Sequence, residues 1–182
     1  ETDMGNLLAF LVLIAQVSSV SIPAVTVTNS ELQETLDIAV AQGITDSPMR
    51  TIDAGGYHVG VAIVGRGPSA NVVAGTIHSE VTEVYSIVDG SATLVTGGRL
   101  IAPRARENTA LRRMLSGPGS TGTGMEGGMV RQVNKGDIII IPAGTPHYFS
   151  DVPESITYTI VRIDPGRGLT LLDRTPPPEM LK

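Results

Sequence analysis

The sequence predicts an all-β fold, a barrel or sandwich of short strands, preceded by one helix. Twenty-one Gly and twelve Pro in 182 residues indicate the many turns that such a fold needs. Hydrophobic residues make up 41% of the chain but aromatic residues only 3%. The core must therefore be built from Val, Ile and Leu, which favours strands. The length suits one domain with a sizeable core.

Charge and cysteine content exclude several classes of function. The formal net charge is −5, and the basic residues are spread along the chain, so we expect no nucleic-acid partner. Cysteine is absent, which excludes disulfides, thiolate metal sites and a cysteine nucleophile. A chain without cysteine is compatible with either an oxidising or a reducing compartment.

The first part of the chain, residues 1–24, contains a continuous apolar run at 7–15. The run is too short for a comfortable membrane span, so we expect none. Its length suits a secretory signal, with Ser18, Ser19 or Ala24 near a cleavage point, although no basic residues precede it. The alternative is an arm that packs on the barrel or on a partner subunit and favours a homodimer. The first interpretation implies a secreted or periplasmic protein, the second a cytoplasmic one.

A helix is predicted at 31–42, inside a helical region that spans 25–48. Ser30 and Gln33 have the spacing of a capping box, and Gly43 follows as a stop signal. Between them, apolar residues recur at helical spacing, namely Leu32, Leu36, Ala39 and Val40. We expect this helix to lie across the outside of the barrel.

Residues 49–165 have the pattern of strands. The predicted strands are 57–64, 71–78, 83–88, 91–96, 129–133, 138–141 and 155–164. Asp89-Gly90 is a hairpin signal and predicts that 83–88 pairs with 91–96. The four consecutive isoleucines at 138–141 predict a strand that is buried on both faces or nearly so.

Residues 99–129 are predicted to be irregular, apart from a short helix at 110–115. The glycine-rich stretch 117–128 looks too flexible to order itself, and it precedes a strand, which excludes a phosphate-binding loop. The insertion could be a lid, or more simply an interface or spacer. The final segment, 166–182, contains Pro176-Pro177-Pro178 and is predicted to be extended on the surface.

One stretch holds a histidine at the rim of the β-structure. Gly136 begins a turn into the isoleucine strand, after which Pro142 and Pro146 interrupt the ladder because proline has no N–H to donate. His147 follows directly. With Gly144, these residues match G-x5-P-x-G-x2-H-x3-N, the second signature motif of the cupin superfamily, with Asp151 where asparagine is usual.

A second stretch resembles the first cupin motif, G-x5-H-x-H-x3-4-E-x6-G. It matches at His78, Glu83 and Gly90, and it departs at Thr76 and Ala70, which replace the first histidine and the leading glycine. The resemblance covers roughly residues 55 to 164. It implies a small single-domain cupin, with a jelly-roll β-barrel and an N-terminal α-helix.

The resemblance also implies a metal site at His78, Glu83 and His147. Two imidazoles and one carboxylate form a facial triad, which suits Fe(II), Mn(II), Zn(II) or Ni(II) and leaves positions open. Thr76 supplies no comparable ligand, so Glu80 or His58 would have to complete a four-ligand site. Each of the three residues also has an ordinary interpretation as a hydrogen-bonding or surface group.

Three functions remain open from the sequence. The first is a metal-dependent enzyme for a small organic substrate, and the second is a non-catalytic small-molecule or sugar binder. The third is an assembly subunit. No nucleophile elbow or zincin helix is present, and catalytic residues are not assigned. Cupins include dioxygenases, isomerases, decarboxylases and storage proteins, so the resemblance does not select a reaction.

Overall fold

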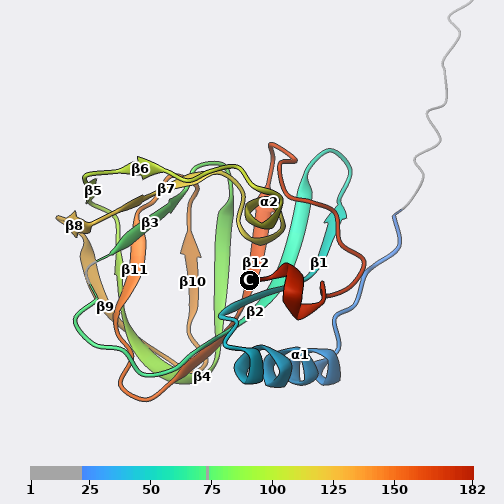
Figure 1. The fold of residues 1–182 in the computed structure, drawn as a ribbon, viewed down its shortest axis with the longest axis horizontal. Coiled ribbons are helices and arrows are strands. Elements are labelled where there is room, and N and C mark those ends of the chain that lie inside the picture. The colour runs from blue at the N-terminus through green and yellow to red at the C-terminus, as the bar shows by residue number, and fades with distance from the viewer. Residues whose placement is uncertain (1–21, 73) are drawn as a thin grey trace, which may run out of the picture.

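The computed structural model describes residues 22–72 and 74–182, and these are mostly β (Figure 1). The elements, in chain order, are α1 (Asn29–Gln42), β1 (Asp46–Asp53), β2 (His58–Arg66), β3 (Gly75–His78), β4 (Thr82–Thr96), β5 (Arg99–Ile101), β6 (Arg104–Ala105), α2 (Ala110–Leu115), β7 (Gly119–Gly122), β8 (Gly124–Glu126), β9 (Met129–Asn134), β10 (Ile138–Ile141), β11 (His147–Asp151), β12 (Ile156–Asp164) and the 3₁₀ turn η1 (Pro178–Met180).

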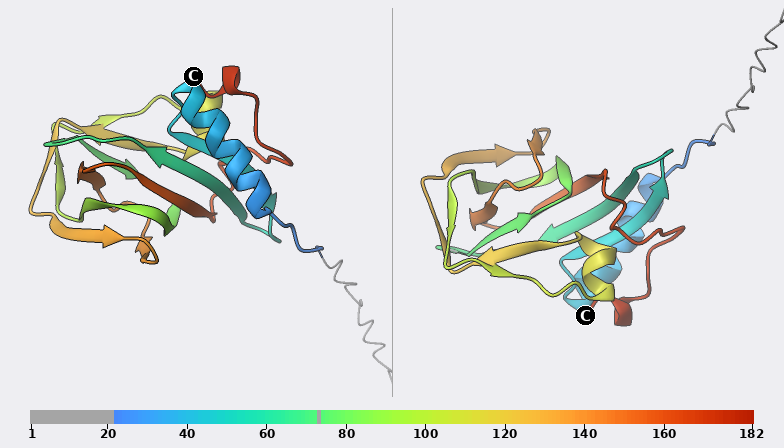
Figure 2. Two further views of the ribbon diagram at one scale, coloured as in Figure 1. Left: turned by 90° about the horizontal axis from the view of Figure 1, so that it is seen from below. Right: turned by 90° about the horizontal axis from the view of Figure 1, so that it is seen from above.

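Ten of these strands form one curled antiparallel sheet. Its order is β1-β2-β12-β4-β11-β3-β7-β6, with β9 and β10 both paired to β4, while β5 and β8 form a separate pair. Neighbours in the sheet come from distant parts of the chain, as in a double-stranded β-helix. The helix α1 lies along the outside of the curled sheet (Figure 2). The predicted all-β fold of jelly-roll type with an N-terminal helix is confirmed.

The cap of α1 differs from the prediction. Thr28, not Ser30, is the N-cap: its side chain accepts from the Glu31 N–H, and the Glu31 side chain accepts from the Thr28 N–H. Ser30 already lies inside the helix, because the extended backbone that a cap requires occurs at Thr28. The predicted stop at Gly43 is confirmed by its left-handed conformation.

The predicted hairpin at Asp89-Gly90 is wrong, because β4 runs without interruption from Thr82 to Thr96. Gly90 has a φ of +76° and pairs with Ile156, and the register between β4 and β12 breaks two residues before it, where Val88 has no partner on β12. A Cβ atom at Gly90 would overlap the carbonyl oxygen of Ser155. The glycine therefore marks a bulge, where the strand bends past its neighbour, instead of a turn.

The isoleucine strand β10 is less buried than predicted. Ile138 and Ile140 are 69% and 67% exposed, and only Ile141 is fully buried. Ile138 and Ile140 share one face of the strand, and their exposure means that no other layer in the described residues covers that face. A run of β-branched residues indicates a strand but does not show whether another layer covers its second face.

The glycine-rich stretch is ordered, against the prediction. Residues in it form β7, which pairs with β3 and β6, and β8, which pairs with β5. At Gly119 a side chain would overlap the carbonyl oxygen of Ile77, so this glycine allows two strands to approach closely. The predicted short helix at 110–115 is present as α2.

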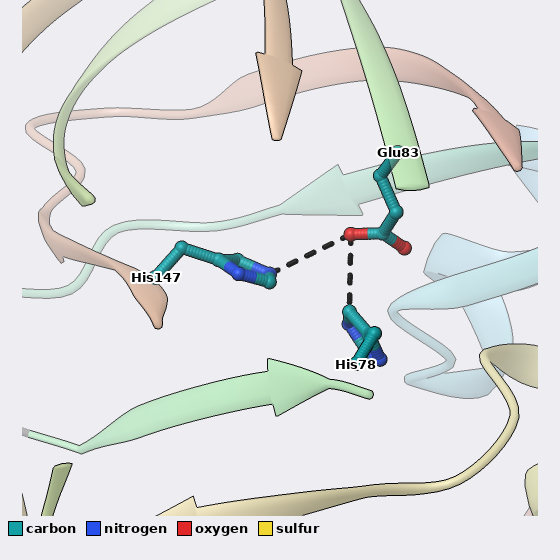
Figure 3. A group of neighbouring side chains, drawn as sticks. All are labelled: His78, Glu83 and His147. Carbon is teal, nitrogen blue, oxygen red and sulfur yellow. Dashed lines mark ion pairs between the residues drawn. The ribbon is translucent and has the colours of Figure 1, made fainter. Parts of the chain in front are cut away.

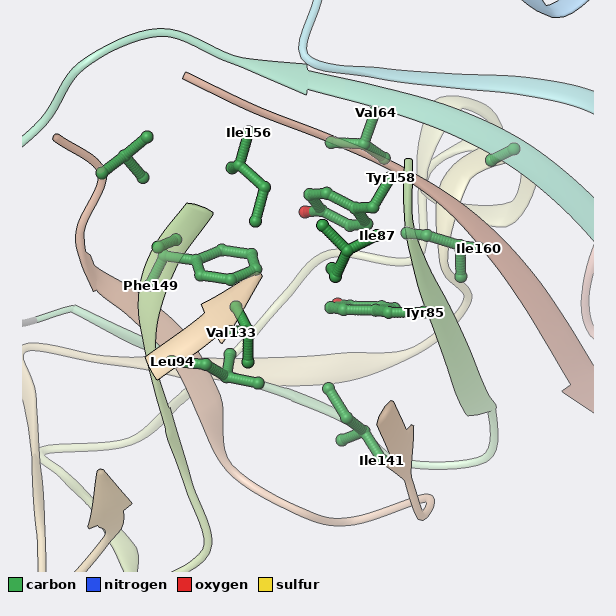
Figure 4. Close-up of a cluster of buried hydrophobic side chains, with 13 residues drawn as sticks. Val64, Tyr85, Ile87, Leu94, Val133, Ile141, Phe149, Ile156, Tyr158 and Ile160 are labelled. Carbon is green, nitrogen blue, oxygen red and sulfur yellow. The ribbon is translucent and has the colours of Figure 1, made fainter. Parts of the chain in front are cut away.

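The core of the curled sheet includes three of the few aromatic residues. Tyr85 and Tyr158 have ring centroids 4.7 Å apart, and Phe149 lies 5.5 Å from Tyr158 (Figure 4). Around them is an aliphatic shell of Ala62, Val64, Ile87, Ala92, Leu94, Val133, Ile141, Val152, Ile156 and Ile160. The expectation of a core made from Val, Ile and Leu alone was therefore incomplete.

The predicted N-terminal segment, residues 1–24, lies outside the described residues except for its last three, which are exposed. Of the helices in 22–72 and 74–182, none has the length and hydrophobicity that a membrane span requires. After β12 the chain returns to β1, where Leu172 pairs with Thr51.

We predict that Gly90→Ala lowers the free energy of unfolding by at least twice as much as Gly136→Ala. Both glycines have positive φ, so both variants carry the backbone strain of about 1–2 kcal/mol. Only Gly90 would also force its new Cβ against backbone, because nothing lies within 4 Å of a Cβ at Gly136. Urea unfolding measures the difference, and equal losses would contradict the bulge interpretation.

Candidate metal centre

The structure brings together His78, Glu83 and His147 (Figure 3). His78 ends β3, Glu83 lies near the start of β4, and His147 begins β11, which pairs with both of those strands. Their exposed fractions are 8%, 1% and 7%. Three polar side chains are therefore buried at one place, although they are far apart in the sequence.

The turn between β10 and β11 is held to the other two elements of the site by hydrogen bonds. The Gly144 N–H donates to the His78 carbonyl at 2.7 Å, and the Ala143 N–H donates to the Thr82 hydroxyl at 3.1 Å. The left-handed φ of Gly144 (+79°) allows this tight turn. The two motif-like stretches of the sequence are thus joined directly.

The spacing of the three side chains suits a shared cation. The Nε2 atoms of His78 and His147 each lie 3.5 Å from Oε2 of Glu83. Two ligand atoms that are each about 2.1 Å from one ion lie roughly 3.0–3.5 Å apart in tetrahedral or octahedral geometry. The donor set and its spacing therefore fit a divalent metal ion.

Glu83 is ionised because a buried arginine compensates its charge. Burial by itself would raise the pKa of Glu83, but Arg162, whose Nε lies 3.0 Å from Oε1, is the main group that lowers it, to about 2. Arg162 also contacts Asp46 at 2.6 Å, and the Tyr85 hydroxyl donates to Oε2 of Glu83 at 2.8 Å. The carboxylate is thus fixed in position and in charge.

Both histidines are neutral at pH 7. Burial lowers the pKa of His78 to about 3, although the charge of Glu83 acts in the opposite direction. Burial also lowers the pKa of His147, again against the effect of Glu83. Neutral imidazole is the form that binds a metal ion, so neither ring has to lose a proton first at neutral pH.

The Nε2 atom of His147, which faces Glu83, carries no proton. Its Nδ1 lies 3.0 Å from the carbonyl oxygen of Thr145, which can only accept, so Nδ1 carries the proton. The lone pair of Nε2 then faces the Glu83 carboxylate, and two acceptors oppose each other at 3.5 Å. A carbonyl partner on the second nitrogen is the usual support of a metal-binding histidine.

His78 has the opposite arrangement. Its Nδ1 lies 2.9 Å from Nη2 of Arg106, which can only donate, so Nδ1 accepts and the proton is on Nε2. An ion at Nε2 of His78 therefore requires this proton to move to Nδ1 and Arg106 to withdraw. After these two changes, all three side chains can face one ion.

The two extra ligands considered for a fourth position are not in this group. His58 is buried elsewhere, with Nδ1 2.9 Å from the Leu169 carbonyl, and Glu80 is exposed. Thr76 pairs with His147 across the sheet and lines the same cavity as the triad, but a neutral hydroxyl is a poor substitute for imidazole. In the described residues, the potential metal-ligand group contains three members.

Sequence analysis missed the arginines of the site. Arg162 lies on the buried face of β12, which it shares with Tyr158, Ile160 and Asp164. An arginine on the apolar face of a strand is a detectable signal, because arginine is almost never buried without a partner. Arg106 follows β6 and carried no such pattern.

A cavity of about 410 Å³ contains the triad. Its walls combine apolar and aromatic side chains with a few charged ones, which is typical of a small-molecule site. The residues lining it are Thr45, Asp46, Val64, Arg66, Val72, Ala74, Thr76, His78, Glu83, Tyr85, Arg106, Arg112, Leu115, Ser116, His147, Tyr148, Phe149, Tyr158, Ile160 and Arg162.

Comparison with known proteins finds likeness in structure only. No family model and no curated protein sequence matches the chain. Among solved structures, a Bacillus halodurans protein has a TM-score of 0.44 and 15% identity, over 79% of this chain and 83% of that one. An uncharacterised Klebsiella pneumoniae protein with a double-stranded β-helix domain has a TM-score of 0.39 and 16% identity, over 70% and 85%.

A third solved structure, recombinant oxalate oxidase in complex with glycolate, has a TM-score of 0.41 and 14% identity. The match spans 71% of this chain and 55% of the oxalate oxidase chain. The neighbours are cupin and double-stranded β-helix proteins, and the likeness to them is one of fold.

The metal-free protein should lose stability as the pH falls below about 6.5. Each histidine has a lowered pKa in the folded state, so unfolding binds protons at mildly acidic pH. The slope is about 1.4 kcal/mol per pH unit for each proton taken up. We therefore expect urea unfolding with a chelator to show a falling free energy between pH 6.5 and 4.5, and His78→Gln to reduce the slope by one proton. A flat profile would contradict the buried, neutral histidines.

Proposed function

We propose that His78, Glu83 and His147 bind one divalent transition-metal ion, of Fe, Mn, Zn or Ni, in the cavity of a small single-domain cupin. One observation carries the proposal: Nε2 of His147 and Oε2 of Glu83, both acceptors, face each other at 3.5 Å in a buried site. Two lone pairs in this position repel unless a cation or a proton lies between them.

The surroundings of the triad support a site that is open on one side. Three protein ligands leave coordination positions for a small molecule, and the cavity provides the space for it. Arg162 and Asp46 hold Glu83 from behind, so the carboxylate does not have to be reorganised when an ion arrives. A bound ion would act as a Lewis acid toward a small organic substrate.

Tyr85 is positioned to hold a proton next to the same carboxylate oxygen. Its hydroxyl donates to Oε2 of Glu83 at 2.8 Å, and burial raises the pKa of Tyr85 well above its ordinary value. The phenol therefore stays protonated and keeps one lone pair of Glu83 occupied. One lone pair of Oε2 then remains on the side of the two histidines.

The alternative is a non-catalytic site that binds a small molecule through hydrogen bonds. A specific observation favours it: the Arg106 contact places the His78 proton on Nε2, where it can be donated to a ligand or to Glu83. Metal content separates the two functions, since the alternative needs no ion.

Protein purified without chelators should contain about one equivalent of a transition metal. We expect His147→Ala and Glu83→Gln to lose it, because each removes one of three ligands. His58→Gln is the matched control: it changes a buried histidine outside the group and should retain the metal. Elemental analysis of folded, monodisperse protein gives the result. A wild type that stays metal-free after addition of Fe(II), Mn(II), Zn(II) and Ni(II) would overturn the proposal.

A further inference from the structure

The cavity around the triad has more positive than negative charge. Four arginines line it, and its two carboxylates, those of Asp46 and Glu83, are both paired with one of them, Arg162. In the described part of the chain, no carboxylate lies within 4.0 Å of the other three guanidinium groups, which belong to Arg66, Arg106 and Arg112. Four guanidiniums against two carboxylates leave an excess of two positive charges.

Arg106 has a buried donor without a partner. Its Nη2 donates to the Ile77 carbonyl at 3.2 Å and to Nδ1 of His78 at 2.9 Å, whereas its Nε is buried and has no hydrogen bond. Leaving a buried donor unsatisfied destabilises the fold, and more so when the donor belongs to a charged group. An acceptor supplied by a ligand would remove this cost.

Arg112 faces the same cavity from a different element. It lies in α2, and its guanidinium makes no hydrogen bond or ion pair with the residues described. Burial and the nearby charge of Arg112 lower the pKa of Arg106 to about 10, which indicates that the two guanidiniums lie close enough to repel each other. An anion between them would relieve that repulsion.

The apolar residues that line the rest of the cavity indicate that the anionic group is part of an organic molecule. Phe149, Tyr158, Val64 and Ile160 form an apolar side of the cavity, and Arg66 stands 5.6 Å from the centroid of the Phe149 ring. A purely inorganic anion would leave this apolar side without a partner. An organic molecule with one charged end can contact both the arginines and the apolar side chains.

We propose that the cavity binds a small organic anion whose carboxylate or phosphate group is held by Arg106 and Arg112, beside the triad. Guanidinium groups bind both kinds of oxyanion through paired hydrogen bonds. This proposal adds the class of ligand to the proposed function. It rests on the proposed function only in placing a metal ion beside the anion. It also gives the 99–129 insertion a role, since both arginines come from it.

Binding is tested by calorimetry on the full chain, as purified and after metal addition. The probes are benzoate, succinate and inorganic phosphate, with benzamide and succinamide as neutral counterparts of the carboxylates. We expect at least one anion to bind and the neutral counterparts not to bind. The preference between the carboxylates and phosphate then identifies the oxyanion.

The variant to compare is Arg112→Gln, which removes one guanidinium without touching the triad. We expect it to weaken anion binding about tenfold or more, because it removes a partner that makes charge-assisted hydrogen bonds with the anion. Arg104→Gln is the matched control, because Arg104 carries the same charge on the same segment but is exposed and outside the cavity. Arg104→Gln should bind the anion like the wild type.

The proposal is overturned if no anion binds the wild type in either form, or if Arg112→Gln and Arg104→Gln bind equally well. Metal analysis of the same samples allows the metal site and the anion site to be tested separately. Anion binding that depends on Arg112 in a protein without metal would refute the metal site alone. One equivalent of metal without anion binding would refute the anion site alone.

Discussion

The contact between Arg162 and Glu83 is the interaction on which the site depends. Both side chains are almost completely buried, and an isolated charge in such a place would cost several kcal/mol. Each charge is tolerated because the other is present, with Asp46 and Tyr85 completing the hydrogen bonds. The pair also joins β12 to β4, so the same contact that keeps the carboxylate ionised fixes the two central strands beside each other.

The side chains of the site therefore form a chain of contacts that begins at the sheet and ends at the insertion. Arg162 and Asp46 set the position and charge of Glu83, and Glu83 faces the two histidines. Beyond the histidines, Arg106 connects the triad to the insertion that follows β4. The region that sequence analysis interpreted as an irregular lid, interface or spacer thus contributes two of the four arginines that line the cavity. A fold known for many functions acquires its local chemistry from such segments.

Sequence analysis identified the residues of the triad but not how the strands pair. His78, Glu83 and His147 were found because motif spacing is local information, and the structure places them together; their role as metal ligands remains a proposal. The bulge next to Gly90 was interpreted as a hairpin, because both features need a glycine with positive φ. The close approach of Ser155, a residue distant in the sequence, distinguishes the bulge from a hairpin. Ile138 is exposed because no other layer covers its face of the strand, and the local sequence pattern contains no information about covering layers.

The pairing of β4 has a consequence for synthesis of the chain. Glu83 and its partner Arg162 are separated by 79 positions, and every other strand that pairs with β4 also follows it in the sequence. Until the ribosome has added β9, β4 has no partner strand, and Glu83 has no arginine partner until β12 follows. Strands with distant partners must close long loops before they form stabilising contacts, so we expect the sheet to fold slowly, as one unit, and only after β12 has been synthesised.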